Sequence, residues 1–264
     1  IELENREHDQ SDVLIIATGG KAAAKLSSDG DGYGFAKALH HTIVSPLPAL
    51  VQLILDEKFL HKSSGVKVEG EASILVNGKV KRVIQDDILF TNYGISGSAI
   101  LDISRVAGVA LAKKERVSLS LNLLPTLEEV VLFEMIEKRL HHTPKRACSL
   151  LLVGFINHKL IPILLKKARI DATAHYDTLN NTDVKRLIQY LLRFEVEVKE
   201  IRAFDYAETT AGGVSTKEVD PKTMESKKVK NLYFTGELLD IDGDCGGYNL
   251  AWAWASGYIA GDSI

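Results

Sequence analysis

The sequence is poor in cysteine, has no long apolar run and carries no excess of basic residues. Its two cysteines, Cys148 and Cys245, are 97 positions apart, which gives neither a disulfide framework nor the ligand spacing of a zinc site. The longest apolar runs, such as residues 149–156, are far shorter than the roughly 18 residues that a membrane-spanning helix needs. The two distant cysteines are therefore expected to be reduced thiols. Because the first residues are acidic and unlike a basic signal sequence, we expect a cytoplasmic setting and no membrane contact.

Charge and size exclude further classes of protein. A formal net charge of −3 and a pI near 6.3, with no basic stripe interleaved with aromatic residues, argue against a nucleic-acid partner. The chain has 264 residues, of which 45% are hydrophobic and 25% are charged, as in an ordinary globular protein of one large domain or two small ones.

The stretch Asn231–Gly257, NLYFTGELLDIDGDCGGYNLAWAWASG, is the most informative part of the chain. It predicts a short buried strand over 232–234, then Gly236 and Glu237, a glycine-dense loop and an apolar helix that begins near Tyr248. A glycine after a strand lets a ligand approach the backbone, and the adjacent carboxylate accepts hydrogen bonds from sugar hydroxyls. The unpaired N–H groups that open the helix would face a polarised or anionic ligand atom.

Four blocks, in order along the chain, resemble a known family. They are ATGG with DGDGYGFAKALHHTI (17–20 and 29–43), PLPALVQL (46–53), FTNYGISGSAILDIS (90–104) and TAGGVSTKEVDPKTMESK (210–227). On these blocks the chain resembles the HI0933-like flavoproteins, also described as BaiN-like or aminoacetone-oxidase-like FAD-binding enzymes. The resemblance implies FAD as cofactor, with hydride transfer between flavin N5 and either a small organic substrate or NAD(P)H.

The resemblance also implies a set of site residues. Backbone contacts near the dinucleotide are expected at Thr18, Gly19 and Gly20. A loop beside the isoalloxazine ring is expected at Gly212 and Gly213, and the ribityl chain is expected at Gly236 and Glu237. The amides expected to stabilise the pyrimidine edge of the ring are those of Gly246, Gly247, Tyr248, Asn249 and Leu250. On the substrate side we expect Asn92 and Tyr93, and no acid–base catalyst is assignable.

Three of these assignments have a purely structural alternative. Residues 19–20 also fit a plain strand-to-loop turn, and residues 212–213 fit a tight bend after an edge strand. Glu237 also fits a solvated surface acid. The order of the four blocks favours the cofactor interpretation.

The sequence lacks the segment with which a dinucleotide-binding domain normally begins. There is no G-x-G-x-x-G motif to seat a pyrophosphate, and no acidic residue about 20 positions after one to bind the ribose. Residues 12–18 instead have the pattern of a late strand of such a domain. We therefore expect an amino-terminal portion to be missing. The alternative function is a cofactor-free, non-catalytic fragment that serves only as a structural or interaction domain pair.

The hydrophobic pattern predicts an α/β plus β fold. By the resemblance, residues 1–45 and 206–264 are expected to form a partial Rossmann-like FAD-binding domain. Residues 46–125 and 195–205 are expected to form an inserted antiparallel β-barrel-like domain, with a hairpin at Asn77-Gly78 and a boundary at Pro46 and Pro48. Residues 126–194 are expected to be a helical insertion, with helices over 147–156, 159–168 and 182–194. Helix caps are expected at Thr126, with Glu129 as its capping-box partner, and at Thr182.

Two further clusters carry weaker predictions. Asp240, Asp242 and Asp244 resemble the start of a calcium loop, but the later glutamate of such a loop is missing, so no metal is expected. Trp252 and Trp254 are expected to be packing residues of the terminal helix or partners for a ring edge, of which packing is the commoner role.

Overall fold

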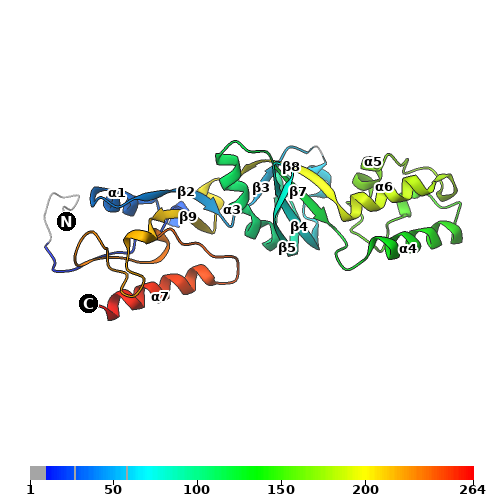
Figure 1. Ribbon diagram of the computed structural model, residues 1–264. Helices are drawn as coiled ribbons and strands as arrows, with labels where there is room; N and C mark the ends of the chain where they lie inside the picture. The colour runs from blue at the N-terminus through cyan, green and yellow to red at the C-terminus, as the bar shows by residue number, and fades with distance from the viewer. Residues whose placement is uncertain (1–9, 27, 58) are drawn as a thin grey trace. The chain divides into compact units, whose positions relative to one another are not determined.

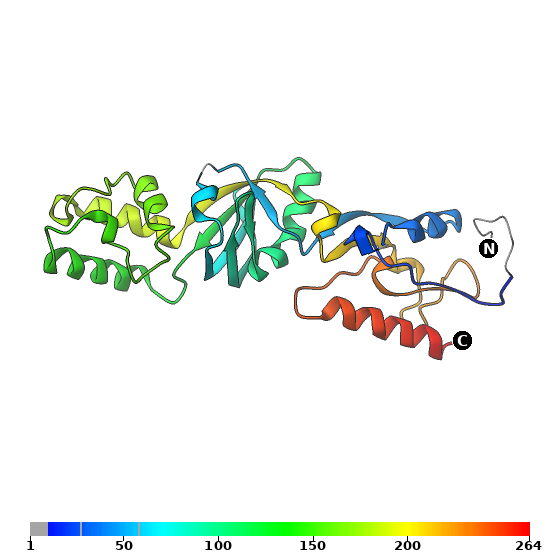
Figure 2. The ribbon, with the colours of Figure 1, turned by 180° about the vertical axis from the view of Figure 1, so that it is seen from behind.

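The chain divides between Leu50 and Val51 and again between Arg202 and Ala203. The computed structural model describes residues 10–26, 28–57 and 59–264 (Figures 1 and 2). The described residues from 10 to 50 together with 203–264 form one unit, here called the two-segment unit, and residues 51–202 form the other, here called the barrel unit.

The barrel unit is built on six antiparallel strands that close into a barrel in the order β3-β6-β5-β4-β7-β8. The strands are β3 (Leu53–Leu55), β4 (Lys67–Val76), β5 (Lys79–Phe90), β6 (Gly94–Ser96), β7 (Val117–Asn122) and β8 (Phe194–Ile201). Along β4 and β7 every second side chain is buried, which is the pattern of a sheet with one face in the core. The expected β-barrel is therefore confirmed.

A tight turn at Asn77-Gly78 joins β4 to β5, as predicted. Both residues have positive φ, 51° and 75°, which is the conformation of a type I′ hairpin turn. This turn fixes the pairing of the two longest strands.

Helix α3 (Ser98–Ala112) packs on the barrel and buries Ile100, Ile103 and Ala107. It begins directly after Gly97, whose φ is 98° and whose missing Cβ would overlap the carbonyl of Asp87 in β5. The sequence analysis did not anticipate this helix.

The helical part of the barrel unit contains α2 (Leu60–Ser63), α4 (Glu129–His142), α5 (Ile161–Lys167) and α6 (Asn181–Leu192) (Figure 1). The helix expected over 147–156 is wrong. Only Cys148–Leu150 forms one 3-10 turn, and Gly154, with φ 88°, continues the chain through turns. An apolar run of this length is buried equally well by turns, because Leu151 and Leu152 reach the core without helical periodicity.

Two expected helix caps are also wrong. The residue before α4 is Glu128, and no side chain caps that helix end, so Thr126 and Glu129 form no capping box. Helix α6 is capped by Asn180, whose Oδ1 accepts the N–H of Thr182 at 2.8 Å. The Asp183 carboxylate in turn accepts the N–H of Asn180 at 3.2 Å, which completes a capping box. Asn180 rather than Thr182 caps the helix, because a capping residue directly precedes the first helical residue.

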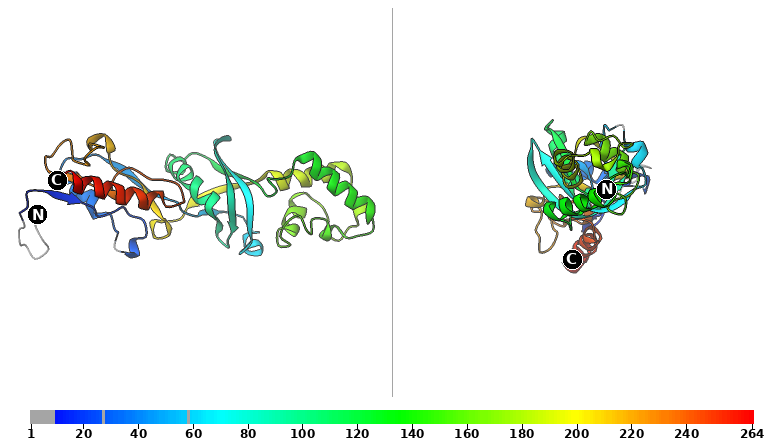
Figure 3. Two further views of the ribbon diagram at one scale, coloured as in Figure 1. Left: turned by 90° about the horizontal axis from the view of Figure 1, so that it is seen from below. Right: turned by 90° about the vertical axis from the view of Figure 1, so that its right-hand side faces the viewer.

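The two-segment unit holds two separate strand pairs. Strand β1 (Leu14–Ile16) runs parallel to β10 (Leu232–Phe234), and β2 (Ile43–Ala49) runs antiparallel to β9 (Thr209–Val214). Helix α1 (Asp31–Ala38) and helix α7 (Tyr248–Asp262) complete the unit (Figure 3). The strand at 232–234 and the helix that begins at Tyr248 are as predicted.

Two details of this unit differ from the sequence analysis. Strand β2 continues through Pro46 and Pro48, because its register shifts between Val44 and Leu47 and so leaves Pro46 outside the regular pairing. The continuous apolar run of residues 13–17 predicts a parallel strand covered on both faces, but within the described residues the side chain of Ile15 in β1 is 42% exposed. Over the same residues, no helix combines the length and the apolar character that crossing a membrane requires.

Candidate functional site

The candidate site lies at the carboxyl ends of β1 and β10. Because these two strands are parallel, residues 17–20 and 235–237 leave the sheet at the same edge. A hydrogen bond of 3.2 Å from the N–H of Thr235 to the carbonyl of Ile16 holds the two exits together. The ends of parallel strands are where α/β proteins bind ligands.

Glu237 is fixed at this edge by β9. Its Oε1 accepts the N–H of Thr210 at 3.1 Å, and its Oε2 accepts the hydroxyl of Thr209 at 2.9 Å. Burial raises the pKa of Glu237, and the bonds from the two threonines oppose that rise. Since a carboxylate has about four lone-pair positions, the group keeps acceptor capacity for a ligand hydroxyl.

The turn after β1 packs tightly on this carboxylate. The hydroxyl oxygen of Thr210 accepts the N–H groups of Lys21 at 2.8 Å and Ala22 at 3.0 Å. Gly20 is buried here, and a Cβ on it would overlap Glu237 Oε1 and Thr210 Oγ1. The glycine is therefore required for the approach of backbone to carboxylate.

The outer side of the same turn faces solvent. Thr18 is exposed, and Gly19 has a φ of 76°, a left-handed conformation that glycine adopts without strain. Thr18 also lies against α1, because a Cβ on Gly32 would overlap the Thr18 hydroxyl. Of the expected dinucleotide contacts, Thr18 is thus accessible and Gly19 partly so, whereas Gly20 is buried.

Tyr33 belongs to this site although the sequence analysis did not single it out. Its hydroxyl is buried and has no hydrogen-bond partner among the residues that the structure describes. Burial, followed by the charges of Glu237 and Asp240, raises the pKa of Tyr33. Its only sequence signal was its position inside the DGDGYGF block. An unpaired buried hydroxyl beside two carboxylates marks a place where the chain's own atoms leave a polar group unsatisfied.

Gly212 and Gly213 lie within β9 and are buried, so neither is part of a loop. Their φ values are 89° and 140°. A Cβ on Gly212 would overlap the backbone of Ser45 in β2, and a Cβ on Gly213 would overlap the carbonyl of Leu238. Both glycines thus allow neighbouring backbones to approach β9 closely.

The glycine-rich loop ends at the amino terminus of α7. Gly247 is the residue before the helix and has a left-handed φ of 88°, and no side chain of the described residues caps this helix end. Gly246, Tyr248 and Leu250 are exposed there. First-turn N–H groups without a cap are available to a ligand, and the helix dipole favours an electronegative atom.

Asn249 has a different geometry from its neighbours in this loop. Its side chain accepts the N–H of Gly243 at 2.8 Å and donates to the carbonyl of the same residue at 3.0 Å. Gly236 is held in a similar way by α7. Its N–H donates to the Ser256 hydroxyl at 2.9 Å, and its carbonyl accepts the indole N–H of Trp252 at 3.1 Å. These bonds fix the positions of both glycine segments relative to α7.

The substrate-side candidates belong to the barrel unit. Asn92 is exposed and Tyr93 half-buried, in the turn between β5 and β6. The guanidinium of Arg202 lies 4.5 Å from the centroid of the Tyr93 ring. The structure therefore gives Tyr93 a cationic neighbour in its own unit.

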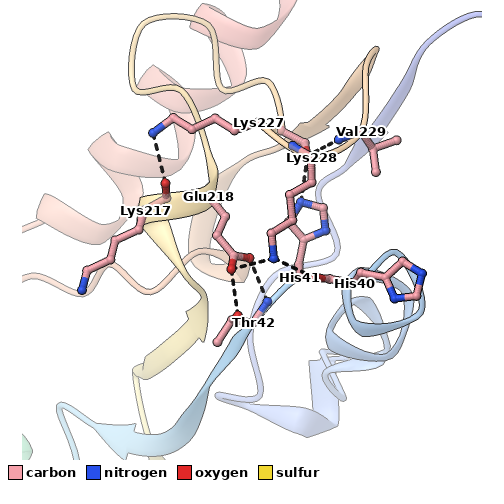
Figure 4. A network of polar contacts seen from close by, with 9 residues as sticks. His40, His41, Thr42, Lys217, Glu218, Lys227, Lys228 and Val229 are labelled. Atoms are coloured by element: carbon pink, nitrogen blue, oxygen red, sulfur yellow. Dashed lines mark hydrogen bonds and ion pairs between the residues drawn. The ribbon is translucent and has the colours of Figure 1, made fainter.

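A polar network lies elsewhere in the two-segment unit, around His41 (Figure 4). His41 is buried, and its Nε2 lies 2.8 Å from the Ser226 hydroxyl. Glu218 accepts hydrogen bonds from the N–H and the hydroxyl of Thr42, and its Oε1 forms an ion pair with the Lys228 ammonium at 2.7 Å. The bond from Lys228, ahead of that from Thr42, lowers the pKa of Glu218 to about 2, while burial lowers the pKa of His41. This network joins the end of α1 to the chain after β9.

No metal centre accompanies these features. Within residues 10–26, 28–57 and 59–264, no three His, Cys, Asp or Glu side chains come close enough to share an ion.

Parallel strand ends, a fixed carboxylate and an uncapped helix end are features that α/β proteins use to bind dinucleotides. The chain belongs to the HI0933-like family, since the family profile described as "HI0933-like protein Rossmann domain" matches residues 1–263. This family is FAD-binding, in agreement with the resemblance drawn from the four sequence blocks. The exposed turn at Thr18, the Gly20 approach and the unpaired Tyr33 hydroxyl fit a polar dinucleotide ligand.

Three characterised relatives align with almost the whole chain. A 3-dehydro-bile acid delta(4,6)-reductase of Clostridium scindens is 37% identical over 251 residues, which is 95% of this chain and 61% of the relative. Ribosomal RNA dihydrouridine synthases of Haemophilus influenzae and Escherichia coli are 31% and 30% identical over 253 residues, 95% of this chain and 60% of each relative. The chain thus spans about three fifths of the length of these relatives.

Proposed function

We propose that this chain is part of an FAD-dependent reductase and supplies the half of the cofactor site that lies at the ends of β1 and β10. The observation that carries the proposal is the Glu237 carboxylate, held by Thr209 and Thr210 against the backbone of Gly20. A carboxylate fixed at the ends of parallel strands is suited to the hydroxyls of a dinucleotide. The assignment of residues 1–45 and 206–264 to the FAD-binding domain remains a prediction.

The residues proposed to hold FAD divide by chemistry. Glu237 would accept hydroxyl hydrogen bonds, and the turn at 18–20 would contact the dinucleotide backbone. The N–H groups of 248–250 would donate to the electronegative edge of the ring system. FAD, when bound, supplies hydride transfer, and the second partner would be NAD(P)H.

The substrate class is proposed from the relatives. Their names describe the reduction of a 3-dehydro-bile acid and the formation of dihydrouridine. In chemical terms both reactions saturate a carbon–carbon double bond conjugated to a carbonyl group. We infer that this chain serves a reductase of such a bond, in which protein N–H donors would polarise the carbonyl.

The first experiment is a titration of the purified chain with FAD, followed by absorbance near ~450 nm and by equilibrium dialysis. We expect saturable binding that Gly20→Ala weakens, because its Cβ overlaps Glu237 and Thr210. Gly257→Ala is the matched control, since a Cβ there meets nothing within 4 Å. A wild-type chain that takes up no FAD would favour the alternative of a cofactor-free fragment, for which the absent G-x-G-x-x-G motif speaks.

The Tyr33→Phe variant separates a ligand role from a folding role. Removing an unpaired buried hydroxyl leaves the ligand-free chain equally stable or more stable. If the hydroxyl serves the cofactor site, FAD affinity falls about fivefold, the value of one hydrogen bond of about 1 kcal/mol. Equal FAD affinities of Tyr33→Phe and wild type would remove Tyr33 from the site.

A further inference from the structure

The net charge of −3 is a sum of two unlike units. The barrel unit, residues 51–202, contains 23 Lys and Arg against 18 Asp and Glu, a difference of +5. The rest of the chain contains 9 Lys and Arg against 17 Asp and Glu, a difference of −8. Within the barrel unit, residues 138–170 include eight Lys and Arg and no Asp or Glu. A local excess of this kind attracts anions whatever the sign of the whole chain.

A cleft of about 740 Å³ opens on the helical side of the barrel unit. It is bounded by the chain after β3, by α2, by α5 with Arg169 beyond its end, and by α6. The residues that give it a charged and aromatic character are Phe59, Lys62, Lys166, Lys167, Arg169 and Tyr190. Asp56 and Glu57 are the acids of its lining, so cations exceed acids by four to two.

One cation of the cleft is held in place. The Lys167 ammonium lies 3.2 Å from Glu57 Oε1 and 5.7 Å from the ring centroids of both Phe59 and Phe194. Contacts of this kind with ring faces stabilise an ammonium and limit its conformations. The site therefore has one preorganised positive charge at its aromatic end.

The other three cations are exposed and are not used by the fold. Among the described residues, Lys62, Lys166 and Arg169 have no side-chain hydrogen bond or ion pair. Arg169 has a left-handed φ of 58° and follows Ala168, the residue that ends α5, at the point where the N–H of Ile170 donates to the carbonyl of Leu165. That helix ending is most favourable with glycine. A bulky cation occupies it here and extends to the cleft.

We propose that this cleft binds a nucleotide, with its phosphate on Lys62, Lys166 and Arg169 and its base beside Tyr190. The exposed cations match a phosphate charge, and the half-buried Tyr190 ring offers a face to an aromatic base. The nucleotide is either free or part of an RNA strand, since both present the same phosphate and base. The site lies wholly within the barrel unit and does not depend on the proposed FAD site.

The test uses the full chain with three probes: AMP, NADPH and a fluorescein-labelled twelve-nucleotide oligouridine RNA. Affinities are measured by fluorescence anisotropy for the RNA and by calorimetry for AMP and NADPH. We expect the double variant Lys62→Ala/Arg169→Ala to weaken binding at least about tenfold, as lost charge-assisted bonds should. For RNA, the slope of log affinity against log salt should fall by about 1.4, or about 0.7 per lost phosphate contact.

A second basic cleft provides the control. It has a volume of about 620 Å³ and is lined by Lys79, Lys81, Arg105 and Lys113, with no aromatic ring among its lining residues. Lys81→Ala/Lys113→Ala removes the same charge and should leave all three affinities within about twofold of wild type. Tyr190→Leu keeps apolar bulk and should weaken binding of the base by about 1 kcal/mol or more, a fivefold loss. Thermal unfolding checks that every variant is folded.

The probes that lose affinity in the Lys62→Ala/Arg169→Ala variant identify the ligand. Loss confined to the RNA identifies an RNA strand as the source, loss confined to AMP and NADPH identifies a free nucleotide, and loss for all probes supports their shared chemistry. Equal losses in the two double variants would show general electrostatics and overturn the proposal. A wild-type chain that binds none of the three probes at low salt would overturn it as well.

Discussion

The two units of the chain bury their apolar residues to very different extents. Among the described residues, the core of the barrel unit contains 39 buried hydrophobic residues and that of the two-segment unit 12. The barrel strands close on one another and leave no free edge, whereas the other unit has two separate strand pairs. Helix α7 is apolar on all sides, yet Trp254 is 76% and Tyr258 74% exposed within this chain.

The unit with the larger core and the unit with the candidate site are different parts of this chain. The barrel unit obtains its stability from one continuous core. The two-segment unit instead holds a half-buried carboxylate, Glu237, and the buried Tyr33 hydroxyl, which has no hydrogen-bond partner among the described residues. Buried polar groups and constrained backbone reduce stability and are typical of ligand sites. We therefore expect the two units to unfold separately.

The largest effect is expected from matched core deletions. Phe90 in the barrel unit and Phe234 in the two-segment unit are both fully buried. Phe90→Ala and Phe234→Ala should each cost about 3–5 kcal/mol of unfolding free energy. Calorimetry should show two transitions, of which each variant lowers only its own. A single transition that both variants lower equally would remove the distinction between the units.

Acidification should act next most strongly, and on the two-segment unit. The pKa of His41 is lowered in the folded chain, so the unfolded chain binds a proton first, and stability is lost as pH falls below about 6.5. Glu218, with a folded pKa of about 2, adds a further loss between its unfolded value of 4.5 and pH 2. Both tryptophans are in α7, so tryptophan fluorescence follows this unit alone. We expect its midpoint to drop by several degrees between pH 7.5 and 5.5, and His41→Gln to flatten that dependence.

A helix cap offers a smaller test within the barrel unit. Asn180→Ala removes the side-chain acceptor for two N–H groups at the start of α6 and should cost about 1 kcal/mol. Asn180→Asp keeps an acceptor and is the control. The loss should be visible in urea unfolding followed by far-UV circular dichroism and absent from tryptophan fluorescence. A shift of the fluorescence transition would mean that the two units are coupled.

The smallest effect on stability is expected at the surface of α7. Trp254→Lys replaces an exposed ring and should change the unfolding free energy by less than about 0.5 kcal/mol. It should also reduce self-association, since an exposed apolar helix surface promotes it. Sedimentation velocity compares the variant with Trp252→Phe, which keeps an aromatic ring at the half-buried position. Strong destabilisation by Trp254→Lys would show that this face is already covered.

Strands and their turns could be predicted from the sequence, because the patterns that indicate them involve only residues that are neighbours in the chain. Asn77-Gly78 requires two left-handed residues, and the alternation along β4 and β7 needs no knowledge of distant residues. The strand over 232–234 and the helix from Tyr248 were found for the same reason. The packing role expected of Trp254 was wrong, because a helix that is apolar all round does not reveal which face is buried.

The site was only partly accessible, because its geometry depends on long-range contacts. The sequence pattern pointed to Gly20 and Glu237 separately, but the contact between them is visible only once β1 and β10 pair. Tyr33 was not singled out since a tyrosine in a short helix carries no local signal of an unpaired hydroxyl. The resemblance placed Gly212 and Gly213 in a loop, whereas both lie in β9, where their missing Cβ atoms let the backbones of β2 and Leu238 approach closely.

The way in which the barrel unit begins and ends has a consequence for engineering. Its first and last residues are adjacent, since the N–H of Arg202 donates to the carbonyl of Gln52 at 3.0 Å and β3 pairs with β8. In the other unit, Glu208 donates to the carbonyl of Leu50, so the polypeptide returns near the point from which it departed. We therefore expect that residues 51–202 can be excised and replaced by a short glycine-serine bridge, or transplanted into a surface loop of an unrelated host protein.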